Sequence, residues 1–197
     1  MRIIVITDAE CLPGEAEAIS ALLEEGVWRV HIRKPGADAE DVSALLDAVP
    51  ERYYGRISLH DCHDLALRYG LGGVHLNGRN PVPPFGFAGL VSRSCHSFSE
   101  LSVYSSICDY MFLSPVFDSI SKQGYRSHFS VEDIRANAYA GTVNDRVFAL
   151  GGVSPDNIRK VSEAGFGGAA VLGYLWEPFR RDCDVPALVG RFRSLSE

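Results

Sequence analysis

The 197-residue sequence contains no CxxC pair, no basic cluster and no apolar run long enough to cross a membrane. Its five cysteines are scattered and odd in number, which favours reduced thiols over a disulfide framework. The formal net charge of -6 argues against non-specific binding of nucleic acid. We therefore expect a cytoplasmic protein without a signal peptide, which binds neither membranes nor nucleic acids.

Common zinc motifs are also missing. The six histidines form neither an HxH nor an HExxH pattern, which disfavours a zinc site. No repeat of solenoid length is visible either. The chain does have 46% hydrophobic residues, which is enough for one substantial core at this length. We expect residues 1–197 to form a single domain.

Short apolar segments alternate with amphipathic ones along the whole chain, a pattern typical of parallel strands joined by helices. The segment 79–89 is an exception, because its prolines and glycines disfavour a regular helix. Open sheets seldom need eight such units, so the pattern predicts a compact, closed (β/α)8 barrel of the TIM type. The predicted strands are 2–8, 29–34, 56–61, 73–77, 90–97, 110–117, 148–153 and 167–173.

Polar residues gather at the carboxyl ends of the predicted strands. In barrels of this class these ends face the active site. Several polar groups that converge on one rim indicate a polar pocket. A buried polar group is costly unless it is hydrogen-bonded, so such a cluster is better explained by a binding site than by packing alone. His75 and Asn77 are expected to pack or to support other residues. The strand-end set is Asp8, His31, Arg33, His60, Asp61, His75, Asn77, Ser94, His96 and Ser114.

Two glycine-bounded segments near the C-terminus predict a phosphate site. The strand 148–153 ends in Gly151 and Gly152, and the strand 167–173 ends in Leu172 and Gly173. Such ends expose backbone N–H groups with no side chain in the way, and a following helix adds a favourable dipole. Loops after strands seven and eight of these barrels commonly bind phosphate.

The order of the motifs resembles the thiamine-phosphate synthase superfamily, which includes the TenI thiazole tautomerases. The resemblance covers nearly the whole chain. Single motifs are weak, but together they are specific. They are HIRKPG (31–36), LHDCHDLAL (59–67), GVHLNGRN (73–80), SRSCHS (92–97), LSPVFDSISK (113–122) and FALGGV (148–153).

The resemblance implies a cytosolic barrel enzyme, usually a homodimer, that acts on small phosphorylated molecules. The synthase joins hydroxymethylpyrimidine pyrophosphate to a thiazole phosphate, with Mg²⁺ on the pyrophosphate leaving group, whereas the tautomerase isomerises a carboxythiazole phosphate and needs no cofactor. The implied synthase residues are Arg33 and Lys122 as catalytic groups, Ser94, Ser119 and Ser121 as substrate-binding groups, and Asp61 and Asn80 as metal ligands.

Some positions depart from the family pattern. Pro35 stands where the synthase has a lysine, His60 where it has an asparagine and Asn80 where it has a second aspartate. Pro115 occupies the position of the tautomerase histidine. Lys34 or Lys122 could offset the missing lysine. An alternative role for Asp61 is to cap the helix that follows it.

Three functions remain open on this basis. The first is the synthase, a transferase. The second is a tautomerase, an isomerase in which His60, then His31 or His96, moves a proton, because histidine titrates near neutral pH. We expect His31, together with Gly151, Gly152, Leu172 and Gly173, to contact substrate. The third is a non-catalytic binder of thiazole phosphate. Outside the family, the polar rim alone would also allow another barrel of the phosphosugar-isomerase type.

Overall fold

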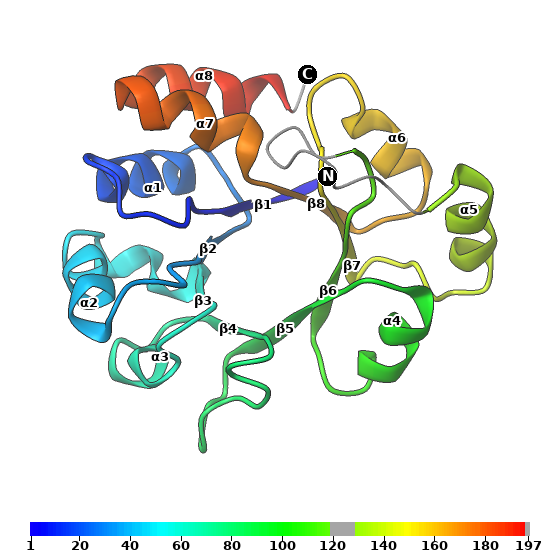
Figure 1. Ribbon diagram of the computed structural model, residues 1–197, viewed down its shortest axis with the longest axis horizontal. Coiled ribbons are helices and arrows are strands. Elements are labelled where there is room, and N and C mark those ends of the chain that lie inside the picture. The colour runs from blue at the N-terminus through cyan, green and yellow to red at the C-terminus, as the bar shows by residue number, and fades with distance from the viewer. Residues whose placement is uncertain (119–128, 196–197) are drawn as a thin grey trace.

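The computed structural model of the protein describes residues 1–118 and 129–195, and these form eight parallel strands closed into one barrel (Figure 1). Each strand pairs with its neighbours in chain order, and β1 closes the sheet by pairing with β8. The predicted (β/α)8 fold is confirmed. The strands are β1 (Arg2–Ile6), β2 (Arg29–Ile32), β3 (Ile57–Leu59), β4 (Gly73–Leu76), β5 (Leu90–Cys95), β6 (Tyr110–Leu113), β7 (Val147–Leu150) and β8 (Gly168–Val171).

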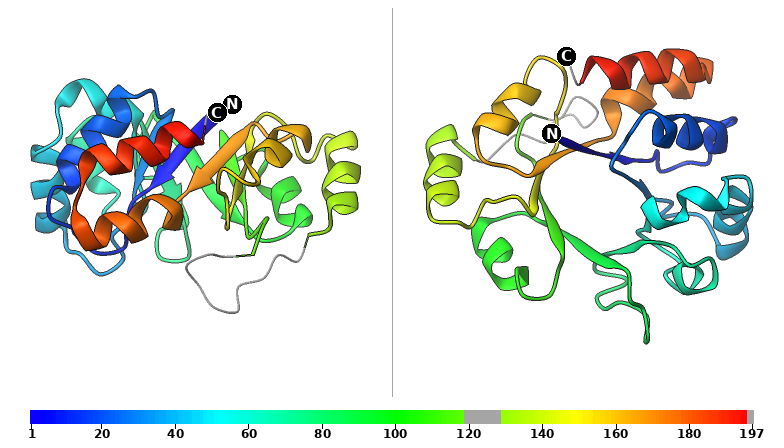
Figure 2. Two further views of the ribbon diagram at one scale, coloured as in Figure 1. Left: turned by 90° about the horizontal axis from the view of Figure 1, so that it is seen from above. Right: turned by 180° about the vertical axis from the view of Figure 1, so that it is seen from behind.

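Helices surround the barrel on its outside (Figure 2). The segment after β4 contains no helix, as predicted from its prolines and glycines. Sequence patterns missed α7, because Pro178 lies inside it and proline usually ends a helix. The helices are α1 (Glu15–Glu24), α2 (Ala39–Asp47), α3 (Asp64–Arg68), α4 (Phe98–Tyr104), α5 (Val131–Tyr139), α6 (Ile158–Glu163), α7 (Gly173–Asp182) and α8 (Val185–Ser194), with a 3₁₀ helix at Glu51–Arg56.

Two apolar clusters hold these layers together. The larger one lies between the strands and the surrounding helices and includes Trp176 and Phe179 of α7, both fully buried. The smaller one fills the barrel interior, where Ile4, Tyr110 and Phe148 pack together. Alternate residues of each strand therefore serve different cores, as the two-residue period of a strand requires.

Close approach of strands explains the glycines at the closure of the barrel. A Cβ atom on Gly168 would lie 2.1 Å from the carbonyl oxygen of Arg2 and 2.6 Å from the ring of Phe148. Gly168 pairs with Arg2 where β8 meets β1. A larger residue would force the two strands apart, so this glycine permits the closure.

A buried ion pair ties the loop after β2 to the first turn of α1. The ammonium of Lys34 lies 2.5 Å from a carboxylate oxygen of Glu15, and both side chains are 1% exposed. The same ammonium donates to the carbonyl oxygens of Asp8 and Glu10. Burial raises the pKa of the Glu15 carboxyl, and the attraction of Lys34 offsets this only in part. Lys34 is thus committed to the fold and does not replace the missing lysine at the rim.

Replacing Lys34 with methionine should destabilise the protein strongly, because the Glu15 carboxylate would remain buried without its partner. We expect a loss of about 3–5 kcal/mol in the free energy of unfolding. The double variant Lys34→Met/Glu15→Leu should recover much of this loss. Urea denaturation of the two single variants and the double variant measures both effects. Additive losses would contradict the proposed coupling.

Candidate active site

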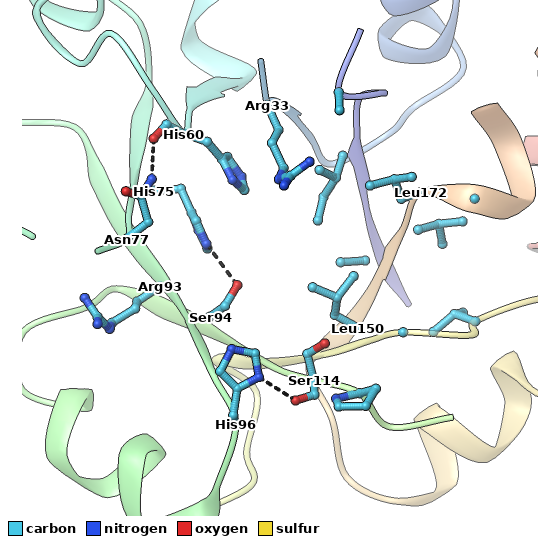
Figure 3. Close-up of a pocket in the computed structure, with 18 of the residues that line it drawn as sticks. Arg33, His60, His75, Asn77, Arg93, Ser94, His96, Ser114, Leu150 and Leu172 are labelled. Atoms are coloured by element: carbon cyan, nitrogen blue, oxygen red, sulfur yellow. Dashed lines mark hydrogen bonds between the residues drawn. The ribbon is translucent and has the colours of Figure 1, made fainter. Parts of the chain in front are cut away.

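A cavity of about 780 Å³ opens at the carboxyl ends of the strands (Figure 3). Its wall includes seven of the predicted site residues, namely Arg33, His60, Ser94, Gly151, Gly152, Leu172 and Gly173. His31, Asp61 and Asn80 do not line it. Ser119, Ser121 and Lys122 lie outside the described residues, so their predicted roles stay predictions.

Backbone N–H groups form one side of the cavity. Within the described chain the N–H groups of Gly151 and Gly152 donate to no acceptor, and no side chain caps the N-terminus of α7 at Gly173. Gly151 and Gly152 both have positive φ angles. A Cβ atom on Gly152 would lie 2.2 Å from the carbonyl oxygen of Asp118. Only glycine fits at position 152, and the N–H groups of Gly151 and Gly152 are suited to bind an anion.

A cation without an ion-pair partner in the described chain lies on another side of the cavity. Arg33 follows β2 and points into the cavity (Figure 3). Its backbone N–H is fixed by the Thr7 hydroxyl at 3.0 Å. Its guanidinium forms no ion pair with any described residue. Half-buried in a cavity and without a counter-charge, this group suits a bound phosphate or pyrophosphate.

A cluster of three buried histidines lies beside the cavity, and two of them, His60 and His75, line its wall. The rings of His60 and His75 stack with centroids 4.0 Å apart. His31 Nδ1 is hydrogen-bonded to His60 Nε2 at 2.9 Å, and His31 Nε2 to the Tyr110 hydroxyl at 2.6 Å. His75 is hydrogen-bonded through Nδ1 to the Ser92 hydroxyl and through Nε2 to the Ser94 hydroxyl. The remaining ring nitrogen of His60 has no partner in the described structure, and this residue lines the cavity.

Burial keeps these rings uncharged. It lowers the pKa of His75 to about 3, and nearby positive charge, including that of Arg93 and Arg33, adds to the effect. Burial likewise lowers the pKa values of His31 and His60 well below their ordinary range. A substrate-binding role for His31 does not fit its position, because it is fully buried behind His60. His31 instead links His60 to Tyr110.

The histidine cluster does not suit a metal ion, although one nitrogen from each ring lies within 4.8 Å of the others. Two of the rings are stacked, and the hydrogen bonds within the cluster use His31 and His75 at both nitrogens. Ligand lone pairs lie in the ring plane, so stacked rings do not aim at one point. The geometry favours a hydrogen-bonded chain of neutral groups.

Asp61 occupies a position behind the cavity wall. Its Oδ1 accepts from Arg79 Nε at 3.1 Å and from Arg79 Nη2 at 2.5 Å, while its Oδ2 is buried without a partner in the described chain. The suggested helix-cap role is wrong, because α3 starts at Asp64 and His63 is its N-cap residue. Asn80 donates from Nδ2 to the carbonyl oxygen of His60 at 3.4 Å.

Sequence reasoning missed three arginines that line the cavity, Arg79, Arg93 and Arg180. Arg79 lies two residues after Asn77, and Arg93 lies in β5 with its guanidinium carbon 4.3 Å from the ring centroid of Tyr104. It also missed Tyr110, whose place in an apolar strand suggested only core packing. The strands of a parallel sheet are usually apolar throughout, so an arginine inside one, such as Arg93, is the pattern that indicates a functional position.

The model of the family described as thiamine monophosphate synthase matches residues 3–175. The chain belongs to this family. The predicted family is therefore confirmed. The matched range includes all eight strands, except for the first residue of β1, and both glycine-bounded loops of the cavity.

Several relatives within the thiamine monophosphate synthase family match this chain over most of their own length. A crystal structure of a thiamine phosphate pyrophosphorylase from Bacteroides thetaiotaomicron is 37% identical, covers 100% of this chain and 96% of its own, and superposes with a TM-score of 0.90. The thiamine-phosphate synthase of Archaeoglobus fulgidus is 25% identical, with 98% of this chain and 96% of the relative covered. That of Thermobifida fusca is 30% identical, with 89% and 85% covered. These relatives carry the synthase or pyrophosphorylase name, in agreement with the function predicted first.

The histidine cluster should make the stability of this family member depend on pH. Below about pH 6.5 the unfolded chain binds protons on His31, His60 and His75, whereas the folded chain resists them because its pKa values are lower. The free energy of unfolding should therefore fall as the pH falls from about 7 to 5. The expected slope is up to about 1.4 kcal/mol per pH unit for each neutral histidine.

Urea denaturation across this pH range measures the slope, and His75→Asn provides the comparison. The variant should be less stable at pH 7 because it loses packing and two hydrogen bonds. Its pH slope should nevertheless be shallower, since one proton-binding group of the unfolded chain is gone. An equal slope in the two proteins would show that His75 is not held neutral.

Proposed function

We propose that the protein is a thiamine-phosphate synthase, a transferase that joins hydroxymethylpyrimidine pyrophosphate to a thiazole phosphate. In this reaction the bond between the pyrimidine methylene carbon and the pyrophosphate oxygen breaks, and its electron pair leaves with pyrophosphate. The lone pair of the thiazole nitrogen forms the new C–N bond. Family membership and the chemistry of the cavity support this proposal.

One observation carries it, namely that the cavity offers two different anion-binding regions. The N–H groups at Gly151, Gly152 and Gly173 donate to no acceptor among residues 1–118 and 129–195, so they suit a phosphate monoester. Arg33, on another wall, suits a pyrophosphate. The synthase has two anionic substrates, and two separate sites let both bind with less mutual repulsion. A protein that binds one phosphate ester needs only one such region.

Apolar residues between these regions would hold the two rings. Ile6, Leu150 and Ala170 all line the cavity. Ser94 lines the cavity, and its hydroxyl is hydrogen-bonded to His75. This bond holds the Ser94 hydroxyl in a fixed position, from which it would contact substrate. The uncharged histidines add no positive charge beside the pyrimidine methylene, where positive charge develops as pyrophosphate leaves.

The residues present fit one magnesium ion with a single carboxylate ligand. The unpartnered, buried Oδ2 of Asp61 supports this. Asn80 adds a neutral oxygen, and its side-chain amide lies 3.4 Å from the carbonyl oxygen of His60, the residue before Asp61. In the synthase these two residues would hold Mg²⁺, which neutralises charge on the leaving pyrophosphate when bound. Arg33 binds the same anion from the side of β2.

A second candidate, a TenI-like tautomerase that needs no metal, is favoured by His60. This ring lines the cavity, has one nitrogen without a described partner and is linked through the other to His31 and Tyr110. A neutral imidazole in this setting can accept a proton from a thiazole phosphate. Pro115, at the cavity wall, cannot take the role of the family's histidine.

Product analysis with the two substrates tests the leading function. The full-length chain with both substrates and Mg²⁺ should release pyrophosphate and form thiamine phosphate. Arg33→Met should reduce this rate about ten- to a hundredfold, because a charged hydrogen bond to the leaving group is lost. The exposed Arg135→Met on α5 removes the same charge away from the cavity and should leave the rate unchanged.

Other outcomes separate the alternatives. Isomerisation of carboxythiazole phosphate that is unaffected by a chelator and lost in His60→Gln, without pyrophosphate release, would replace the synthase with the tautomerase. Binding of thiazole phosphate with neither activity would identify a non-catalytic binder. The homodimer and the cytoplasmic location implied by the resemblance remain part of this proposal. No helix among the described residues is long and apolar enough to span a membrane.

Gly152→Ala should abolish most binding of thiazole phosphate. Its φ of 64° disfavours alanine, and the added Cβ would force the loop away from Asp118. Gly141→Ala is a matched control, because Gly141 also has a positive φ, of 80°, but its Cβ would meet nothing within 4 Å. The control should cost about 1–2 kcal/mol in stability and leave affinity unchanged. Calorimetric titration with thiazole phosphate and thermal denaturation provide the two measurements, and equal affinities in both variants would remove this loop from the site.

A further inference from the structure

The turn after β4 brings Arg79 to the cavity in a fixed conformation. The side-chain oxygen of Asn77 accepts from the backbone N–H groups of Arg79 and Asn80 at 2.9 and 3.0 Å. The side-chain amide of Asn77 donates to the carbonyl oxygen of His60 at 2.5 Å. Asn77 therefore closes the turn and ties it to the end of β3, which fixes where the Arg79 side chain starts.

Asp61 then orients the guanidinium. Both contacts of Arg79, from Nε and Nη2, go to the same carboxylate oxygen. The Asp61 side chain is 11% exposed and lies off the cavity, whereas the Arg79 side chain is 60% exposed and lines it. Of the five N–H groups of this guanidinium, Asp61 uses two. The others donate to nothing within residues 1–118 and 129–195, so they are available to a ligand.

The charges around Arg79 favour an anion at this part of the cavity. Four arginines line the cavity (Arg33, Arg79, Arg93 and Arg180), against three carboxylates (Asp8, Glu100 and Glu177). Arg180 pairs with Asp8, whereas Arg33 and Arg93 form no ion pair with a described residue. The carboxylate nearest to Arg79 is that of Asp61, and its negative charge is already paired with the Arg79 guanidinium. A pyrophosphate has several acceptor oxygens, and guanidinium groups bind such oxygens in pairs.

We propose that Arg79, held by Asp61, binds the pyrophosphate group of the substrate directly, so that the protein binds pyrophosphate without a divalent cation. This inference rests on the proposed function for the identity of the substrate. It concerns binding and leaves open how strongly Mg²⁺ accelerates bond cleavage. In this chain Asp61 thus serves first to position an arginine, and it is available to a metal through its second oxygen.

Calorimetric titration of the full chain with inorganic pyrophosphate in the presence of EDTA tests the proposal. The unaltered protein should bind, and Arg79→Met should bind about ten- to a hundredfold more weakly. Arg68→Met is the matched control, since Arg68 is an exposed arginine at the end of α3 outside the cavity, and its affinity should not change. Adding Mg²⁺ should restore part of the pyrophosphate affinity of Arg79→Met, because Asp61 no longer pairs with a guanidinium in this variant and is free to bind the metal ion.

Two further variants examine how Arg79 acts. Arg79→Lys keeps the charge without the planar fork and should bind pyrophosphate with intermediate affinity. Asp61→Asn should weaken binding in EDTA, because the guanidinium loses its anchor. Tighter binding in Asp61→Asn would show that the carboxylate merely repels the anion and would overturn its positioning role. Thermal denaturation of each variant identifies any that fail to fold.

Equal affinity of Arg79→Met and the unaltered protein in EDTA would overturn the proposal, and so would binding by the unaltered protein only when Mg²⁺ is present. The coupling assay keeps this result separate from the proposed function. Arg79-dependent binding of pyrophosphate without product formation would refute the synthase and leave the anion site standing. Product formation together with pyrophosphate binding that does not depend on Arg79 would support the synthase and refute the Arg79 site.

Discussion

Closure of the sheet between β1 and β8 is the constraint on which the site depends. Because all the described strands run parallel in a closed ring, their carboxyl ends meet at one rim. Gly168 permits this closure by letting β8 approach Arg2. The Arg33 end of β2 and the glycine end of β7 therefore face one cavity, although they are far apart in the sequence. Without closure they would lie on different parts of an open sheet.

A narrow closed barrel must fill its interior, and here part of the filling is polar. His31, fully buried, connects His60 at the cavity with Tyr110 in the interior cluster. Arg29 donates to the Ser58 hydroxyl and to the carbonyl oxygen of Gly55, which leaves only part of its guanidinium unpartnered. Buried polar groups are tolerated when they bond to one another. The rings stay neutral as a consequence of this burial, so the cavity gains proton acceptors without gaining charge.

The strand order and the rim could be predicted because they depend on local patterns. Apolar runs, polar strand ends and the glycine pair at 151–152 are visible in the sequence, and they led to Arg33, His60 and the glycine loop, all of which line the cavity. The direction of a side chain at the rim is not visible in this way. Lys34 follows Arg33 directly, yet it turns away to a buried pair with Glu15, because α1 packs there. His31 was expected at the cavity. It shares a face of the chain with Arg33, two residues on, but lies deeper in the barrel, where it is fully buried and bonded to Tyr110.

The two anion-binding regions differ in how far sequence can reveal them. In the proposed site, the backbone N–H groups of Gly151 and Gly152 would bind an anion through main-chain geometry. That geometry requires glycine and therefore leaves a pattern in the sequence. These donors carry only partial charges, so their electrostatic effect is weaker than that of a guanidinium. The second region is formed by the Arg79 guanidinium, whose position depends on the residue that it pairs with. That residue is Asp61, which follows β3, whereas Arg79 follows β4. That pairing arises only when β3 and β4 lie side by side, so the fold is needed before the charge of this region can be understood.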